Sequence, residues 1–194
     1  KDCIIYNSIR EPYLFYKSVN YLLQNVGNRF SLQQLGKSLG SNENTMGSYI
    51  NYLCNSYICS DIRNFSFSLK ETKRSDHKCY CIDNGLMQAN TSRFSPDSGK
   101  FFENLVYNEL VNKGYQNISF DNGKGECDFL AQKDGDIHAF QVCYELTDNN
   151  KTREFRGFSV PQIPVRTKTL ITYNQKEQVD DIRVMPLWEW ALEK

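Results

Sequence analysis

Apolar residues recur every three to four positions along three stretches near the amino terminus of the chain. Residues 11–27 carry such a stripe, which is typical of a helix with one buried face. Ser31 is placed to cap a second, short helix that Gly40 ends, and Ser41-Asn42 starts a third helix. The pattern therefore predicts a helix followed by a second helix, a tight turn and a third helix.

A strand-like pattern replaces the helical period after the third helix. Residues 57–61 and 79–82 have the composition of strands, and residues 70–78 between them are polar. A hairpin that follows three helices is the order of a winged helix-turn-helix domain. We therefore predict such a domain in the first half of the chain.

A composition change marks the boundary between two domains. Residues 90–99 are rich in Ser, Asn, Pro, Asp and Gly, and such a stretch is typical of a linker. We predict one domain over residues 1–96 and a second over residues 97–194, with the boundary near Pro96.

Helical and strand-like patterns alternate in the second half. The sequence predicts helices over residues 100–113, 151–158 and 187–192, and strands over residues 118–120, 127–131, 137–144, 169–173 and 182–185. A helix, a hairpin, a second helix and further strands predict a mixed sheet flanked by helices. The predicted fold class is therefore α/β (α+β).

Composition excludes several classes of protein. A chain of 194 residues with 40% hydrophobic and 13% aromatic residues is typical of a globular protein. No apolar run is long enough to span a membrane and no signal peptide is evident, so we expect a cytoplasmic protein without a membrane partner. The odd number of cysteines, seven, favours reduced thiols over a disulfide framework.

Charge is balanced over the whole chain but differs between its halves. Residues 1–96 contain 11 Lys and Arg against 7 Asp and Glu, and residues 97–194 contain 12 against 16, which gives +4 and −4. This imbalance allows a local basic patch but falls short of the strongly basic footprint of a dedicated nucleic-acid-binding protein.

Four polar or reactive residues stand in order in the second half. Glu103 lies in F-F-E-N-L-V, Asp128 in E-C-D-F-L, and both Gln141 and Cys143 in F-Q-V-C-Y. Side chains two residues apart on a strand point to the same face, so Gln141 and Cys143 share one face. Charged residues among Phe, Leu and Cys in a strand favour a shared polar pocket over solvated side chains.

This order resembles the PD-(D/E)XK, or restriction-endonuclease-like, superfamily, in which a helix Glu, a strand Asp and an E-x-K pair surround Mg²⁺. The resemblance implies catalytic positions at Glu103, Asp128, Gln141 and Cys143, with the first three as metal ligands. Here Gln141 replaces the nuclease Glu and Cys143 replaces the nuclease Lys. An amide can still donate an oxygen to Mg²⁺, but a thiol is a poor ligand for so hard an ion and lacks the positive charge of lysine. The resemblance therefore implies a degenerate site; the alternative is an active Mg²⁺-dependent nuclease that uses a lysine from elsewhere.

More specifically, the chain resembles the carboxy-terminal region of bacterial and archaeal AAA-type ATPases, a domain of unknown function. Its elements stand at residues 99–106 (G-x-x-x-E-N-x-V), 126–129 (E-x-D-F), 141–144 (Q-V-x-Y), 153–154 (R-E) and 186–190 (P-L-x-x-W). The resemblance implies an amino-terminal ATPase domain that this chain lacks, and ATP would bind only there. Gly36-Lys37-Ser38 mimics the end of a P-loop, but the first glycine is missing and the segment is predicted to be helical.

Nucleic-acid contacts are predicted for the winged helix. Asn44, Thr45 and Ser48 would face a groove, and Arg63, Lys70, Lys73, Arg74 and Lys78 of the wing would contact phosphates. The outward face of the third helix carries no Arg or Lys, which disfavours sequence-specific reading. The alternative is a module for packing or protein contact. In the second half, residues 147–154 are typical of a loop and the capped start of a helix; the alternative is that Arg153 reaches a phosphate.

Together these observations predict an interaction module of an AAA-type ATPase that contacts nucleic acid and is not catalytic by itself. No cofactor is required by such a module, and Mg²⁺ enters only with the nuclease alternative. The predicted partners are DNA, the ATPase domain of the same protein and a further protein. A purely protein-binding sensor module remains the third alternative, and steep salt dependence of DNA affinity would distinguish it.

Overall fold

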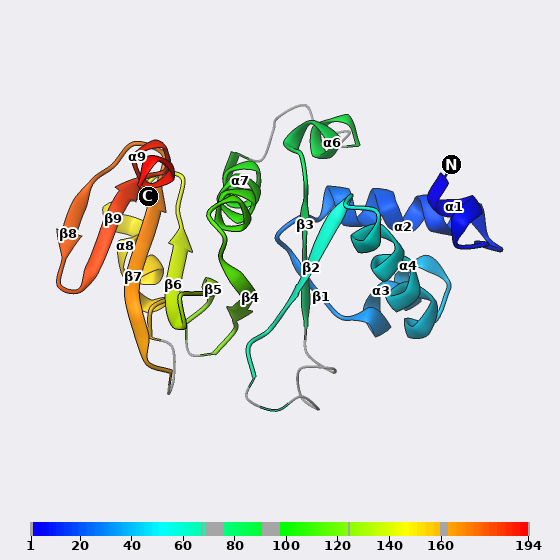
Figure 1. Ribbon diagram of the computed structural model, residues 1–194, viewed down its shortest axis with the longest axis horizontal. Helices are drawn as coiled ribbons and strands as arrows, with labels where there is room; N and C mark the ends of the chain where they lie inside the picture. Colours follow the sequence, from blue (N-terminus) through cyan, green and yellow to red (C-terminus); the bar gives the residue numbers. More distant parts are fainter. Residues whose placement is uncertain are drawn as a thin grey trace. The chain divides into compact units, whose positions relative to one another are not determined.

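The computed structural model describes residues 2–66, 68, 76–90, 98–123, 125–159 and 163–193 (Figure 1). The chain forms two compact units. The first unit comprises Lys1–Arg63 and Lys73–Pro96, and the second comprises Asn64–Thr72 and Asp97–Lys194. Both contain helices and sheets, so the predicted mixed α/β fold class is confirmed.

The first unit combines helices with a small antiparallel sheet. Its helices are α1 (Asp2–Tyr6), α2 (Pro12–Gln24), α3 (Leu32–Leu39), α4 (Glu43–Asn55) and α6 (Asn84–Ala89), and its strands are β1 (Arg29–Phe30), β2 (Cys59–Arg63) and β3 (His77–Cys81). The strand order is β1-β3-β2. The predicted hairpin is therefore present as β2 and β3, whereas β1, α1 and α6 were not predicted.

Capping side chains set the ends of the helices in this unit as predicted. The Ser31 hydroxyl accepts a hydrogen bond from the Gln34 backbone N–H at 3.2 Å, and the Asn42 side chain accepts one from the Thr45 backbone N–H at 2.9 Å. Gly40 ends α3 with φ of +71°, a left-handed conformation that glycine adopts without steric cost. The residues of the P-loop mimic, 36–38, lie inside α3.

The core of the first unit is apolar and lies between its helices and its sheet. Helix α4 contributes the buried stripe Met46, Tyr49, Ile50 and Leu53. These residues form one cluster with buried apolar residues of α2, α3 and the strands. The three-to-four spacing in the sequence therefore identified the buried face of this helix correctly.

The second unit is built on a mixed sheet. Its elements are α7 (Ser98–Asn112), β4 (Gln116–Asp121), β5 (Cys127–Lys133), β6 (Asp136–Val142), α8 (Asp148–Arg156), β7 (Val165–Thr172), β8 (Glu177–Val179), β9 (Ile182–Pro186) and α9 (Leu187–Leu192). The strand order is β4-β5-β6-β7-β9-β8. Strands β4, β5 and β6 are antiparallel, whereas β6, β7 and β9 run parallel. Only β8 was not predicted.

Helices cover both faces of this sheet. On one face, the ring of Tyr107 on α7 lies 6.0 Å from Phe129, and Trp190 on α9 lies 5.5 Å from Phe140. Phe129 and Phe140 are partners in the β5–β6 ladder and therefore share this face. Leu130 and the other residues of alternate parity point to the opposite face, where they join a cluster that includes Phe155 and Phe158 in and after α8.

A short segment between β2 and β3 belongs to the second unit. Asn64 forms a parallel bridge with Phe120 of the edge strand β4, and the Phe65 backbone N–H donates to the Phe120 carbonyl at 2.7 Å. The Asn64 side chain accepts a hydrogen bond from the Asn122 backbone N–H at 2.9 Å. The chain thus contributes to the second unit before the predicted boundary near Pro96, and Pro96 itself lies outside the described residues.

Candidate functional site

Strands β5 and β6 separate at the position where the sequence predicted a polar pocket. Their ladder ends at the pair Phe129 and Phe140. Beyond it, the Asp128 carboxylate accepts the Val142 backbone N–H at 2.9 Å, and the Gln141 side-chain oxygen accepts the Asp128 backbone N–H at 3.2 Å. Asp128 and Gln141 are both buried. The two side chains therefore replace the backbone bonds that the diverging strands no longer make.

Helix α8 adds a buried carboxylate to this pair. Glu154 is 4% exposed, and one of its oxygens accepts a hydrogen bond from the Gln141 side-chain amide at 3.0 Å. Its other oxygen accepts from the Nε of Arg153 at 3.0 Å and from an Nη of the same residue at 2.5 Å. We call Asp128, Gln141, Glu154 and Arg153 the polar network. A neutral amide thus joins two carboxylate residues inside the second unit.

Cys143 lies beside the polar network as a neutral thiol. Its Sγ donates to the Glu145 carbonyl at 3.1 Å and accepts from the Asn150 side-chain amide at 3.5 Å. Burial, together with the negative charge of Glu154, raises the pKa of the Cys143 thiol to about 11. Cys143 therefore cannot supply the positive charge that lysine holds in the nuclease motif.

Two glycines allow α8 to approach the strands closely. A Cβ at Gly125 would lie 2.2 Å from the Arg156 carbonyl oxygen, and a Cβ at Gly157 would lie 2.6 Å from the side-chain oxygen of Gln141. Real Cβ atoms do not approach other atoms so closely, so any larger residue at these positions would displace the last turn of α8. The glycines therefore hold Glu154 within reach of Gln141.

The structure brings three of the four predicted catalytic positions together. Asp128, Gln141 and Cys143 lie at one end of β5 and β6. Glu103 is half-buried on α7, whose ring contacts run to the opposite face of the sheet, and its convergence with Asp128 stays a prediction. The sequence analysis named Glu154 only as part of the R-E element at residues 153–154 and gave it no place in the site.

The arrangement does not fit a Mg²⁺ site as it stands. One carboxylate oxygen of Asp128 and the amide oxygen of Gln141 are engaged by backbone N–H groups. Within the part of the chain that the structure describes, no group of three or more His, Cys, Asp or Glu side chains is placed to hold a metal ion. Metal coordination by Glu103, Asp128 and Gln141 therefore stays a prediction that these hydrogen bonds disfavour.

The nucleic-acid positions predicted in the first unit have mixed surroundings. Asn44 and Ser48 are exposed on α4, whereas Thr45 is half-buried and its hydroxyl bonds to the capping Asn42. Arg63 pairs with Asp61 at 3.6 Å, and Lys78 is 2% exposed because it lies in the central strand β3, not on a protruding wing. Lys70, Lys73 and Arg74 lie outside the described residues.

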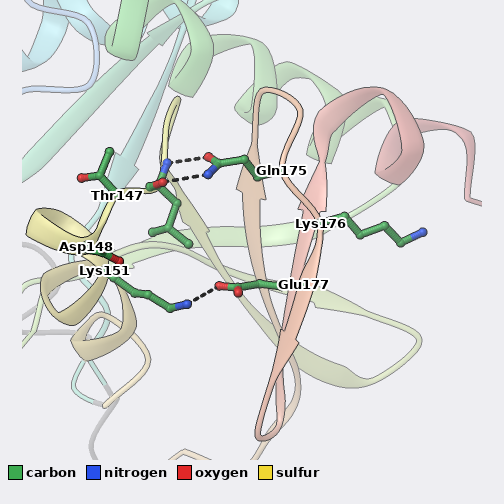
Figure 2. A pocket seen from close by; sticks show the side chains of 7 residues that line it. Thr147, Asp148, Lys151, Gln175, Lys176 and Glu177 are labelled. Carbon is green, nitrogen blue, oxygen red and sulfur yellow. Dashed lines mark hydrogen bonds and ion pairs between the residues drawn. The ribbon is translucent and has the colours of Figure 1, made fainter.

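A cavity of about 390 Å³ opens where α8 begins (Figure 2). The Gln175 side chain forms two reciprocal hydrogen bonds with the backbone of Leu146, at 2.6 and 2.7 Å. Lys151 of α8 pairs with Glu177 of β8 at 2.6 Å. Figure 2 shows these interactions, which run from α8 and its preceding loop to Gln175, between β7 and β8, and to Glu177, the first residue of β8. These interactions hold the first turn of α8 in place, and the close contacts at Gly125 and Gly157 hold its last turn.

Comparison with known families divides the chain near its middle. The family described as domain of unknown function DUF8612 matches residues 1–97, which is half of the chain. The chain belongs to the DUF8612 family. A second domain of unknown function, DUF4143, matches residues 98–190, and this family is associated with AAA-type ATPase proteins. The DUF8612 match thus covers the whole of the first unit, and the DUF4143 match covers the helices and strands of the second up to residue 190 in α9.

Two curated relatives of this DUF8612 protein match almost the whole chain. An uncharacterized protein of Methanocaldococcus jannaschii is 30% identical over 99% of this chain and 47% of its own length. An uncharacterized protein of Haemophilus influenzae is 26% identical over 99% of this chain and 50% of its own length. The chain therefore spans about half the length of the curated relatives it matches. The predicted likeness to a domain of unknown function in archaeal and bacterial proteins is confirmed.

No solved structure matches the chain. Among the described residues, none of the helices has both the length and the apolar character needed to cross a membrane.

Proposed function

We propose that this chain is an interaction module of an AAA-type ATPase that contacts nucleic acid without cleaving it. The observation that carries the proposal is the polar network. Asp128 and Gln141, at the positions of nuclease metal ligands, each accept a backbone N–H from the other's strand, and Gln141 also bonds to Glu154. They serve the fold where β5 and β6 diverge, and Cys143 offers a neutral thiol where the nuclease motif has lysine.

The order of elements supports a nuclease-like origin for the second unit. A helix with Glu103, a strand with Asp128 and a neighbouring strand with Gln141 follow one another as in the PD-(D/E)XK motif. The first unit supports a winged-helix assignment, since α3, a short turn and α4 are followed by the hairpin β2–β3. Both assignments favour nucleic acid as the partner.

The DUF4143 match supports the connection to an ATPase. DUF4143 is associated with AAA-type ATPases, and the relatives have about as much chain again beyond the part that matches. An ATPase domain would supply ATP binding and hydrolysis, which no residue of this chain is proposed to perform. The chain would then couple that motor to a nucleic-acid contact.

A comparison of cleavage with stability tests the proposal. Wild type, Asp128→Ala and Asp128→Asn are incubated with single- and double-stranded DNA and RNA in Mg²⁺ or Mn²⁺, and each is unfolded in urea. We expect no cleavage, a loss of about 1–3 kcal/mol in unfolding free energy for Asp128→Ala, and a smaller loss for Asp128→Asn, which keeps an oxygen for the Val142 N–H. Metal-dependent cleavage that Asp128→Ala abolishes would make the chain a nuclease instead. Absence of any nucleic-acid binding at low salt would favour the protein-binding sensor.

A further inference from the structure

Helix α8 presents a continuous polar stripe to solvent. Asn149, Thr152, Arg153 and Arg156 are all exposed, and their spacing of i, i+3, i+4 and i+7 places them along one side of the helix. The stripe contains two arginines and no acidic residue. Asp148, the other exposed residue of the helix, lies in its first turn at the edge of the cavity.

A buried carboxylate fixes the orientation of Arg153. The side chain of Arg153 is 80% exposed, yet two of its nitrogens donate to one oxygen of Glu154. Glu154 cannot swing outward with the arginine, because its other oxygen is bonded to Gln141. An exposed arginine usually samples many rotamers, whereas here one edge of the guanidinium is bonded to Glu154 and the side chain otherwise stays exposed to solvent.

Arg156 is the second exposed cation on α8, beside Arg153. Among the described residues it has no acidic partner in hydrogen-bond or ion-pair range, and it lies one turn beyond Arg153. Its backbone carbonyl packs against Gly125. The helix that carries both arginines is therefore held at its first turn by the Lys151–Glu177 pair and at its last turn by the glycine contacts.

From this geometry we propose that the α8 stripe binds the phosphodiester backbone of nucleic acid, with Arg153 and Arg156 contacting phosphate oxygens and Glu154 acting as a positioning residue. The inference rests on the proposed function and names the surface that makes the contact. Guanidinium groups match phosphate oxygens in a bidentate geometry, and Asn and Thr side chains commonly contact phosphates too.

The composition of the stripe favours nucleic acid over a protein partner. The buried centre of a protein interface is enriched in aromatic and other apolar residues, whereas the four residues of the stripe are all polar. Contacts to phosphates need no apolar centre and carry no sequence information. A sequence-independent backbone contact is therefore the expected mode of binding.

Salt-dependent binding tests the stripe. A fluorescein-labelled oligonucleotide, single-stranded or duplex, is titrated with the full chain between about 50 and 200 mM salt. We expect Arg153→Gln and Arg156→Gln each to reduce the slope of log K against log salt by about 1, and the double variant by about 2. The matched control is Arg166→Gln, which removes an equally charged side chain that is 71% exposed on β7. It should leave the slope unchanged.

Glu154→Gln separates positioning from net charge. This change makes the chain more positive, so a nonspecific electrostatic attraction would raise its affinity for DNA. The tether instead predicts a lower affinity, because Arg153 loses its carboxylate partner. Thermal unfolding of each variant checks that the fold persists, and Arg156→Gln keeps the test valid if Glu154→Gln unfolds.

Each remaining outcome decides between the inference and the proposed function. If wild type binds and the double variant keeps its affinity and slope, the stripe is wrong and the proposed function stands. If wild type binds no nucleic acid at the lowest salt, nucleic-acid contact itself is wrong. If poly-glutamate binds wild type and Arg156→Gln abolishes that binding while DNA affinity is unchanged, the stripe belongs to an acidic protein partner, which overturns the inference.

Discussion

Helices α4 and α8 both expose polar residues, but different forces hold them in place. Helix α4 buries four apolar residues, Met46 through Leu53, and exposes amides and hydroxyls such as Asn44 and Ser48. Helix α8 has Glu154 as its buried residue and exposes two arginines. An apolar stripe holds α4 in place, whereas α8 is held by the polar network, two glycine contacts and one half-buried aromatic residue, Phe155.

This difference teaches that the side chains a helix exposes to a partner can depend on the interactions that hold the helix against its own unit. Apolar packing holds α4 firmly, and the exposed Ser48 hydroxyl donates only to the Asn44 carbonyl of the same helix. The buried Glu154 both anchors α8 and orients an exposed cation. Helix α4, which the sequence predicted as the recognition helix, therefore exposes less of the positive charge that phosphate contact needs than α8 does.

The largest expected effect comes from adding one methyl group under α8. Gly125→Ala would place a Cβ 2.2 Å from the Arg156 carbonyl, so either α8 or the strand must move. We expect a loss of about 3 kcal/mol in the free energy of unfolding, measured in urea. The matched control is Gly47→Ala in α4, whose Cβ would meet only a Leu32 methyl at 3.4 Å. It should stabilise the protein by about 0.5–1 kcal/mol, since alanine favours helix. Equal effects of the two changes would refute the contrast in seating.

The reactivity of the Cys143 thiol tests how firmly α8 is held, and it can be measured on the unaltered protein. With the pKa of Cys143 raised from 9.0 to about 11, the thiolate fraction at pH 8 should be about 100-fold lower than in the unfolded chain. Because the pKa of Cys143 is higher in the folded chain than in the unfolded chain, the contribution of the protonated thiol to the free energy of unfolding is complete below pH 9. This contribution is lost as the pH rises toward 11. We expect slow alkylation of Cys143 by iodoacetamide, measured by peptide mass spectrometry, and faster alkylation in Gly125→Ala. Rapid alkylation in wild type would show that α8 opens readily.

The smallest expected effect concerns the exposed face of α4. Asn44→Ala removes an exposed amide that carries no charge, so we expect the affinity for DNA to change less than about twofold and the salt slope to stay the same. Fluorescence anisotropy with the same oligonucleotide measures both. A loss greater than that of Arg156→Gln would reverse the ranking of the two helices and place the main contact on α4.

The sequence predicted the elements whose pattern is long enough to show a period. Helix α9 begins and ends at the predicted residues, 187 and 192, and the caps of α3 and α4 are those expected. Strands β1 and β8 were missed because two or three residues cannot show an alternation. Helix α8 was predicted to begin three residues late, because its first turn is polar and is defined by the Thr147–Asn150 capping box.

The candidate site was predicted in part for equally physical reasons. Alternation placed Gln141 and Cys143 on one face of their strand, and the structure joins Gln141 to Asp128 of the neighbouring strand by a hydrogen bond. The role of Glu154 depends on a contact across 13 residues of sequence, which no local pattern encodes. Whether Glu103 reaches this end of the sheet depends on which face α7 covers, and periodicity alone cannot assign a helix to a face.

The segment around Asn64 and Phe65 has a consequence for how the protein is made and handled. It leaves the ribosome before β3 and well before β4, yet its hydrogen bonds are to Phe120 and Asn122. During synthesis this stretch therefore has no partner until β4, more than fifty residues later in the chain, has emerged. A recombinant fragment that starts at residue 98, where the second family match begins, would lack it and bare the outer edge of β4. Such an unpaired edge favours strand pairing between molecules, so an expressed second half should aggregate unless the stretch with Asn64 and Phe65 accompanies it.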